Sequence, residues 1–376
     1  MSSTFSFGFA GDDIDIDEND TGDVNQEGFT FRQGISARLP ELVPARRHDM
    51  SEWIPSLPSQ ISYNKLAIPI SQHGSPGKPV TLARRDVYDI RTQLMAEDTA
   101  EDREDNYELI TGLEKGDIKP NFYEGGFKTW ECALDLAKLL LDANAMNAMT
   151  KTAGKRHFIE LGAGTAVPSL ALFAQLLSME PNAQRRVHFT FADYNSAVLR
   201  LVTFPNLLLT WNYIVSAQGT PLSAESLSPE DGDTEDELLE ISPELVASFQ
   251  RDLKRQGITV EFVSGAWSPE FVDLVFSSGE QSRSDALILA SETIYSPTSL
   301  QAFSETLLAL LRRPAQEGFS SQALIAAKKV YFGVGGGVDE FLAVVGGISG
   351  GNLRVQERLD VKSEGVGRVI LEIVLG

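Results

Sequence analysis

The sequence contains little cysteine and little histidine: one cysteine, Cys132, and four widely spaced histidines among 376 residues. A single cysteine excludes an intrachain disulfide and a cysteine-based zinc site, and it is typical of a reducing compartment. His48, His73, His157 and His188 have no metal-ligand spacing, so we expect no metal centre. We interpret each histidine as a surface or packing residue.

Long apolar runs and positive charge are also scarce. No apolar run reaches the roughly 18 residues that span a bilayer, and the amino terminus is acidic where a secretory signal is basic, so we expect a soluble protein without a membrane partner. The chain has 32 Lys and Arg against 53 Asp and Glu, a net charge of -21. This charge argues against direct binding of nucleic acid and is compatible with a basic protein partner.

Two segments are acidic and lack apolar periodicity. Residues 1–50, which contain GDDIDIDENDTGD, are interpreted as a disordered tail, and residues 216–244, which contain no Lys or Arg, as a surface insertion. Residues 51–122 are predicted to form an N-terminal extension of extended segments and one helix. The main domain is expected over residues 123–376.

Short apolar strand patterns alternate with helical patterns after Arg156. The predicted strands are HFIELGAG, VHFTFADY, ITVEFVSG, DALILASE and QALIAAKKVYF, followed by a closing hairpin from NLRVQERLD and GVGRVILEIVLG. The helical patterns between them include AVPSLALFAQLLSM and TSLQAFSETLLALLRR. We therefore predict an α/β fold: a doubly wound, Rossmann-like, seven-stranded, mostly parallel sheet with an antiparallel last strand.

Polar residues follow three of these strands. The first ends in Glu160 and continues through Gly162 and Gly164 into a helix, a turn that lets the backbone approach a ligand. This turn alone is a weak signal, but Asp193 closes the second strand and can accept the ribose hydroxyls of an adenosine, and SETIY closes another. No Gly-Lys-Ser/Thr follows the turn, and no further small residue suits a pyrophosphate. The combination favours S-adenosylmethionine over a dinucleotide.

The stretch YFGVGGGVDEF follows the fifth predicted strand. Without Lys-Ser/Thr it is not a nucleotide phosphate loop. Two interpretations stay open. The glycines relieve backbone strain in a flexible turn, or the loop lies against a peptide substrate, with Tyr331, Phe332 and Gly335 in its wall.

In the combination of its motifs, the chain resembles the protein-histidine N-methyltransferases, seven-strand S-adenosylmethionine enzymes that modify a large-subunit ribosomal protein. The matching segments are YEGGFKTWEC, ELGAG, Asp193-Tyr-Asn195, SGAWS, SETIY and YFGVGGGV. Ala166 stands where the family has a third glycine, and Ala266 where it has a glutamate. The resemblance implies a basic ribosomal protein as partner, a monomer, and a location in cytoplasm and nucleus.

The resemblance also implies a cofactor pocket. Its expected residues are Thr129, Trp130, Glu131, Cys132, Ala133, Glu160, Gly162, Gly164, Ala192, Asp193, Tyr194, Gly265, Ala266, Trp267 and Ser291. Gly162 and Gly164 would approach the methionine moiety, Asp193 would hold the ribose, and Ala266 with Trp267 would flank the adenine. Trp130 is alternatively a core residue. Cys132 is interpreted as a packed helical residue and not as a nucleophile.

Methyl transfer requires a lone pair, the methyl carbon and the sulfur in line, and a neutral imidazole supplies such a lone pair at pH 7. An acceptor that binds the ring N–H selects the tautomer and aims the other nitrogen, by resemblance Nτ. Glu292, Asn195 and Tyr295 are the candidates for this role; Glu292 is alternatively a structural partner of Lys328 or Lys329. Competing functions are a lysine methyltransferase of the same fold and a non-catalytic binder of a basic ribosomal protein.

Overall fold

The computed structural model describes residues 42–72, 75–97, 118–119, 123–142, 154–182, 185–219, 237–332, 335–362 and 366–376. The folded unit begins at Leu42, because Arg46–His48 form a strand, β1, that pairs antiparallel with β11 (Ile258–Ser264). The predicted tail over residues 1–50 is therefore wrong for its last nine residues, 42–50. Residues 1–41 lie outside the described residues.

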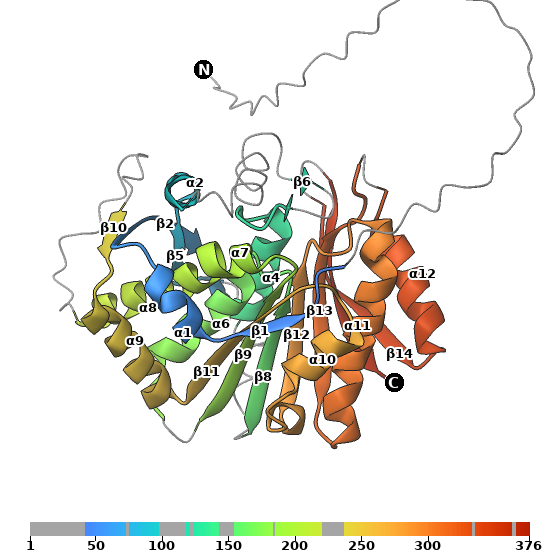
Figure 1. The fold of residues 1–376 in the computed structure, drawn as a ribbon. Coiled ribbons are helices and arrows are strands. Elements are labelled where there is room, and N and C mark those ends of the chain that lie inside the picture. Colours follow the sequence, from blue (N-terminus) through green and yellow to red (C-terminus); the bar gives the residue numbers. More distant parts are fainter. Residues whose placement is uncertain are drawn as a thin grey trace, which may run out of the picture. The chain divides into compact units, whose positions relative to one another are not determined.

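Within the described residues, the main sheet has eight strands (Figure 1). In spatial order they are β1 (Arg46–His48), β11 (Ile258–Ser264), β9 (Arg186–Asp193), β8 (Lys155–Leu161), β12 (Asp285–Ser291), β13 (Ser321–Lys328), β15 (Arg368–Leu375) and β14 (Leu353–Val361). The five strands from β11 to β13 are parallel, and β15 is antiparallel to both of its neighbours. The doubly wound sheet with an antiparallel last strand is thus confirmed, and β1 adds one strand to the predicted seven.

Helices cover both faces of this sheet (Figure 1). One face carries α4 (Glu131–Leu141), α6 (Val167–Ser178), α8 (Phe204–Gly219) and α9 (Pro243–Gln256). The other carries α10 (Pro269–Val275), α11 (Pro297–Gln316) and α12 (Val338–Ser349). Phe158 points into the first core and Ile159 into the second. Strands buried on both faces are apolar throughout, which is why the sequence shows continuous apolar runs and not alternation.

Local signals explain where these helices begin. In α9, Ser242 caps the first turn by accepting a hydrogen bond from the N–H of Leu245, and Pro243 occupies the first helical position. Its buried apolar residues are Val246, Phe249 and Leu253, at spacings of three and four, and Gln256 is buried at its end. This amphipathic spacing places one stripe of the helix against the core.

The extension contributes a smaller sheet, in the order β10-β2-β5. Residues 50–124 form α1 (Met50–Trp53), the turn η1 (Ile54–Ser56), β2 (Gln60–Ile68), β3 (Ser71–Gln72), β4 (Ser75–Pro76), β5 (Val80–Arg85), α2 (Val87–Ala96), β6 (Ile118–Lys119) and β7 (Tyr123–Glu124). β3 pairs with β4, and β6 pairs with β7. β10 (Glu237–Glu240) pairs with β2. The predicted acidic insertion over residues 216–244 is therefore too long: α8 reaches Gly219, α9 begins at Pro243, and residues 220–236 lie outside the described residues.

The helical stretch Ser196–Ala217 comprises α7 (Ser196–Val198), a π-helical turn η2 (Leu199–Thr203) and most of α8. Among the described residues it is the one stretch long and apolar enough to cross a membrane by length and composition. Arg200 and Asn206 interrupt it, so no continuous apolar run is visible in the sequence. Of its most apolar window, 72% is buried inside the domain, as in the core helix of a globular protein.

Candidate functional site

The turn between β8 and α6 is held in a left-handed backbone conformation. Gly162 and Gly164 have φ values of 64° and 50°, which glycine adopts freely. A Cβ on Gly164 would lie 3.1 Å from the carbonyl oxygen of Gly126, so the loop before α4 passes directly over the turn. Ala166 also has a positive φ, 57°, at a cost of about 1–2 kcal/mol for an L-residue. That cost explains why a glycine suits this position.

Glu160 lies beneath this turn and is buried. One carboxylate oxygen, Oε2, accepts a hydrogen bond from the N–H of Ser169 in the first turn of α6, at 3.0 Å. Burial raises the pKa of Glu160 to about 8, and the nearby charge of Asp193 adds to the rise. Its other oxygen, Oε1, is buried and has no hydrogen-bond partner within the described residues. Glu160 therefore provides an uncommitted polar atom close to the predicted cofactor.

Asp193 ends β9 beside the turn, as predicted. Its Oδ2 accepts from the N–H of Gly164 at 3.1 Å, and its Oδ1 accepts from the N–H of Asn195 at 3.2 Å. The backbone fixes the neighbouring residues: Ala192 accepts from Ala163, while Asp193 and Tyr194 accept from Gly265. Asn195 caps α7, because its Oδ1 accepts from Ala197 at 2.8 Å. This capping hydrogen bond already uses Oδ1 of Asn195, the atom that would accept the N–H of a substrate imidazole.

The segment Thr129–Ala133 enters α4 next to the turn. Thr129 donates a hydrogen bond to Thr165 at 3.0 Å, which ties this segment to the turn. The indole N–H of Trp130 donates a hydrogen bond to the carbonyl of Gly125, and the Lys328 ammonium lies over its ring. Because the ring is only half-buried, Trp130 is not one of the buried core residues among the described residues. Cys132 and Ala133 are buried. Burial and the Glu292 carboxylate raise the pKa of the Cys132 thiol. The burial of Cys132 in α4 agrees with its interpretation as a packed helical residue.

The side chain of Glu131 points to solvent and does not line a closed pocket. Its side chain is 62% exposed and lies 3.7 Å from both Lys328 and Arg368. Arg368 in turn binds Asp135 at 2.6 Å. Any contact of Glu131 with a cofactor would therefore come from its backbone at the beginning of α4.

Glu292 follows β12 in a strained conformation, with φ of 55°. One oxygen, Oε1, accepts from the N–H of Cys132 at 3.3 Å, and the other lies 3.5 Å from the Lys328 ammonium. Lys329 pairs with Asp360 instead. The structural interpretation of Glu292, as a partner of Lys328, is thus confirmed. Glu292 also joins β12 to α4, while Ser291, half-buried, is the last residue of the strand.

The glycine-rich loop packs against the segment that follows Glu292. A Cβ on Gly336 would lie 2.2 Å from the carbonyl oxygen of Tyr295, so no larger residue fits. Tyr331 is half-buried, its ring 6.2 Å from that of Tyr295, and burial together with the Glu292 charge raises its pKa. Phe332 is 79% exposed. Gly335 is also exposed, and residues 333–334 lie outside the described residues.

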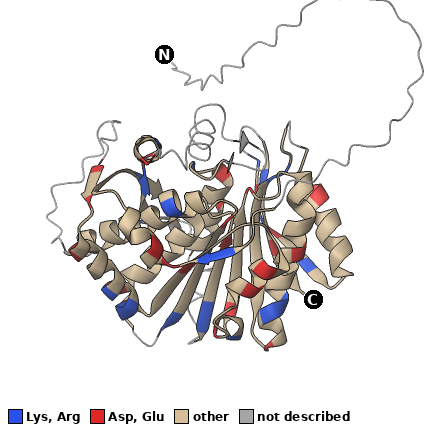
Figure 2. Ribbon diagram, viewed as in Figure 1, with Lys and Arg blue, Asp and Glu red and all other residues tan. Residues whose placement is uncertain are grey.

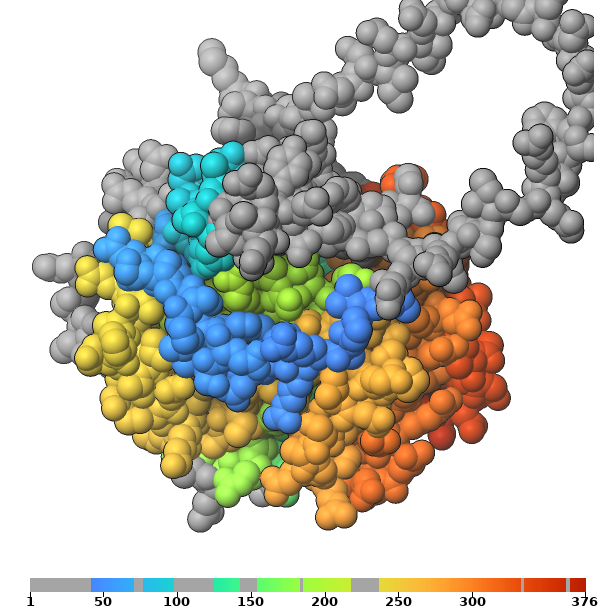
Figure 3. Space-filling view, in the orientation of Figure 1, coloured from blue at the N-terminus to red at the C-terminus, as the bar shows by residue number. Residues whose placement is uncertain are grey.

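The predicted adenine wall is covered by a segment that the sequence pattern placed in the tail. We call residues 42–48 the strap. A Cβ on Gly265 would lie 2.5 Å from the carbonyl oxygen of Pro44, and the N–H of Ala266 donates to Val43 at 3.0 Å. Trp267 packs edge-on against Phe271. In Figure 3 the residues from 42 onward form a continuous blue band across this face.

Two side chains of the strap, the exposed Arg47 and the buried His48, anchor it to the domain. Arg47 lies 2.9 Å from the carboxylate of Glu261, which is buried, and it also donates to Ser277. His48 is buried, bonds to Ser264 at 2.8 Å and stacks on Trp53. The strap is therefore part of the folded domain next to the candidate site. Nothing in its short sequence, LVPARRH, indicates this.

The structure thus brings most of the predicted residues to the carboxyl edge of the sheet, where open α/β sheets bind ligands. Basic residues that begin β8 and β9, Lys155, Arg156 and Arg186, lie at the opposite ends of those strands (Figure 2). The part of the chain that is described contains no group of three or more metal-ligating side chains. A second feature that sequence reasoning missed, Arg84, reaches the site from β5 and bonds to Thr129 at 2.7 Å.

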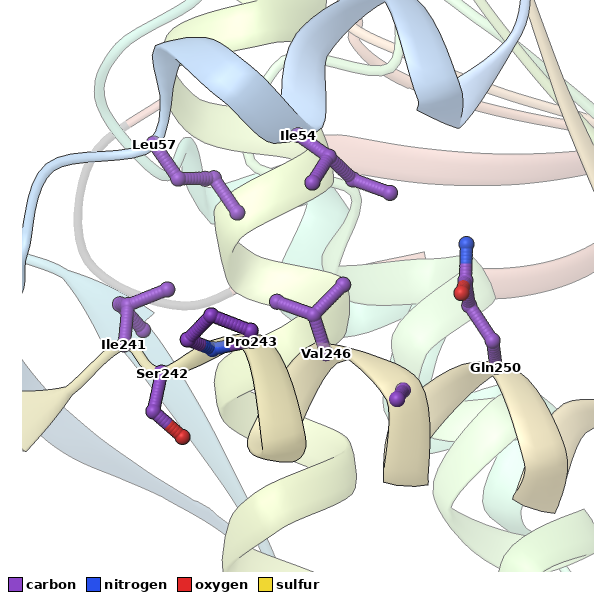
Figure 4. A pocket seen from close by; sticks show the side chains of 8 residues that line it. Ile54, Leu57, Ile241, Ser242, Pro243, Val246 and Gln250 are labelled. Carbon is purple, nitrogen blue, oxygen red and sulfur yellow. The ribbon is translucent and has the colours of Figure 1, made fainter.

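A separate cavity of about 310 Å³ lies between η1 and α9. Its lining includes Ile54, Leu57, Pro243 and Val246 (Figure 4). None of the predicted site residues lines it. It contains neither the glycine turn nor a strand end of the main sheet, so it is distinct from the candidate site.

Comparisons with known proteins identify relatives of nearly the full chain. It is 32% identical to Histidine protein methyltransferase 1 of Saccharomyces cerevisiae, over 90% of each chain. It is 31% identical to the protein of that name from Schizosaccharomyces pombe, over 91% of this chain and 84% of that protein. With the Rattus norvegicus homolog the identity is 30%, over 89% and 76% respectively.

No protein-family model matches the chain. Among solved structures, the N-terminal domain of EvdMO1, in the presence of SAH and D-fucose, covers 73% of this chain and 97% of its own at 10% identity, with a TM-score of 0.32. M. capricolum TrmK in complex with SAH covers 63% of this chain and 70% of its own at 12% identity, with a TM-score of 0.28. Likeness at this level says nothing about ligand or substrate.

Proposed function

The chain belongs to the histidine protein methyltransferase family, and from this membership we propose that it transfers a methyl group to a histidine imidazole of another protein. The observation that carries the proposal is 32% identity to such a protein over 90% of both chains. The polar carboxyl edge of the sheet supports it, because that edge provides a site of the required kind.

We propose S-adenosylmethionine as the methyl donor. The residues fit it: the left-handed turn leaves room for a ligand beside the backbone, Asp193 offers a carboxylate for ribose hydroxyls, and Glu160 has an uncommitted buried oxygen. When bound, the donor supplies a methyl group on a positively charged sulfur. Gly162, Gly164 and the segment Thr129–Ala133 would hold its methionine portion.

The protein's own task is to position a neutral imidazole. The ring nitrogen that carries the lone pair forms the new N–C bond while the C–S bond breaks, and the other nitrogen then loses its proton to water. A group that accepts the second N–H selects the tautomer. Glu292 already binds Cys132 and Lys328, and Asn195 already caps α7.

Tyr295 is the remaining candidate. Its hydroxyl makes no hydrogen bond within the described residues, while its ring contacts Tyr331. We therefore favour Tyr295 as the acceptor that orients the substrate ring. Tyr295→Phe is expected to lower kcat about 10- to 100-fold and leave S-adenosylhomocysteine affinity unchanged. Unchanged kcat would remove Tyr295 from this role.

For the substrate, we propose a basic large-subunit ribosomal protein. The net charge of -21 supports a basic partner, because charge complementarity speeds association. The expected location in cytoplasm and nucleus and the expected monomeric state stay predictions that accompany this proposal.

The test is incubation of the protein with labelled S-adenosylmethionine and ribosomal proteins from cells that lack this activity, followed by mass spectrometry. Methylhistidine in one ribosomal protein is the expected product. Methyllysine would favour a lysine methyltransferase of the same fold. Tight binding of a ribosomal protein without any methyl transfer would favour the non-catalytic binder.

A further inference from the structure

Arg84 lies at the end of β5, beside the candidate site, and the side chains that it contacts are uncharged. Its guanidinium donates to Thr129 at 2.7 Å and to Asn64 at 2.9 Å. Its Nε is buried without a hydrogen-bond partner in the part of the chain that is described, and burial lowers the pKa of Arg84. No carboxylate within the described residues pairs with it.

The neighbouring residue shows the usual arrangement for such a cation. Arg85 is fully buried, whereas Arg84 is half-buried, and Arg85 binds the carboxylate of Asp89 at 2.6 Å and the carbonyl of Leu201 at 2.9 Å. Taking a positive charge out of water is costly unless an anion and further hydrogen bonds compensate for it. The chain supplies that compensation for Arg85 and, among the described residues, leaves it incomplete for Arg84.

The position of Arg84 indicates what would complete the pairing. Thr129 joins Arg84 to Thr165 through hydrogen bonds of 2.7 and 3.0 Å, and Thr165 directly follows Gly164 in the turn. The guanidinium is therefore two hydrogen bonds from the turn at which a cofactor is proposed. Its planar fork of N–H donors suits a carboxylate, which it can bind with two parallel hydrogen bonds.

We propose that Arg84 binds the α-carboxylate of the cofactor's amino-acid portion and so makes the site selective for S-adenosyl ligands that carry this group. The inference rests on the proposed function, since it assigns one end of the same cofactor. It also gives the extension a role: β5 carries a cation into a site whose other residues come from the main domain.

The test compares two ligands that differ in this carboxylate alone. Decarboxylated S-adenosylmethionine keeps the adenosine, the sulfonium and the amine of S-adenosylmethionine. In the full chain, Arg84→Met is expected to weaken S-adenosylmethionine binding roughly 10- to 100-fold, measured by calorimetry. Binding of the decarboxylated ligand should change less than about threefold, since Arg84 has nothing to pair with there.

Stability separates this role from a purely structural one. Removing a half-buried charge that no carboxylate pairs with among the described residues should leave the melting temperature of the ligand-free protein unchanged or raise it. Asn64→Ala, which removes one neutral partner and keeps the cation, is the matched control and should affect both ligands less than about threefold. If Arg84→Met does not fold, Arg84→Lys decides, because it keeps a charge and should lose affinity only for the carboxylate ligand.

Two results would overturn the inference while leaving the proposed function intact. One is an equal loss of affinity for both ligands, and the other is no loss for either, each with a wild type that binds S-adenosylmethionine. A wild type that binds neither ligand would overturn the proposed function, and the inference with it.

Discussion

Replacing Glu160 by glutamine removes a titrating group from beneath the glycine turn at almost constant size. The pKa of Glu160 is raised from 4.5 to about 8 in the folded protein, chiefly by burial. Because the folded state holds this proton more tightly than the unfolded state, the proton stabilises the fold fully below pH 4.5. That stability is lost as the pH rises through about 8.

The size of the effect follows from the two pKa values. Each pKa unit corresponds to about 1.36 kcal/mol, so the difference between 4.5 and about 8 has a ceiling of roughly 5 kcal/mol. Between pH 5 and pH 8 the wild type should lose roughly 3 to 4 kcal/mol through this group. Glu160→Gln has no proton to lose, so its free energy of unfolding should lack this decline.

The assay is urea denaturation of the ligand-free protein and of Glu160→Gln at half-unit intervals from pH 5 to pH 8. The difference between the two proteins is the informative quantity, because titrating groups that do not interact with Glu160 contribute equally to both. His157, for example, has a pKa lowered by burial, so it weakens the fold as the pH falls below 6.5. Parallel stability profiles would show that Glu160 is already ionised in the folded protein and would refute the reasoning.

Three further predictions concern the walls of the site. Gly336→Ala should lower kcat at least about tenfold, because the added Cβ displaces the glycine-rich loop from the carbonyl of Tyr295. Gly347→Ala, whose added Cβ meets nothing, should leave kcat unchanged. Equal effects of the two variants in steady-state assays would contradict the close packing of Gly336 against Tyr295. Because Glu292 is already bound to Cys132 and Lys328 and Tyr295 is the favoured acceptor, Glu292→Gln should keep cofactor affinity in calorimetry and kcat within about threefold, whereas a fall in histidine methylation of about tenfold or more would return Glu292 to the mechanism. Arg47→Met should cost about 1–3 kcal/mol in urea denaturation, because it removes the arginine partner of the buried Glu261 carboxylate. Arg46→Met, whose side chain is more exposed, should cost less than about 0.5 kcal/mol, and similar losses would contradict this anchor.

Much of the main domain could be predicted from the sequence, because its signals are local. Strands buried on both faces are short apolar runs, and residues such as Glu160 and Asp193 end them. Since parallel strands end at one edge, these residues had to come together there. The structure confirms the shared edge. It also shows what periodicity does not reveal, namely the left-handed backbone at Glu292, and it decides that the Glu292 carboxylate pairs with Lys328 and not with Lys329.

The two largest misses, the strap and Arg84, both lie outside the main domain, toward the amino terminus, and they share a physical cause. Each depends on contacts far along the chain: Val43 meets Ala266, and Arg84 meets Thr129. Without β1, β11 would end the sheet with unpaired backbone groups, an arrangement that folded proteins usually cover. Backbone pairing of this kind requires little from side chains, so three residues sufficed and no pattern marked them. An edge strand that borders a predicted site is therefore a reason to look for its cover in segments whose sequences predict no structure.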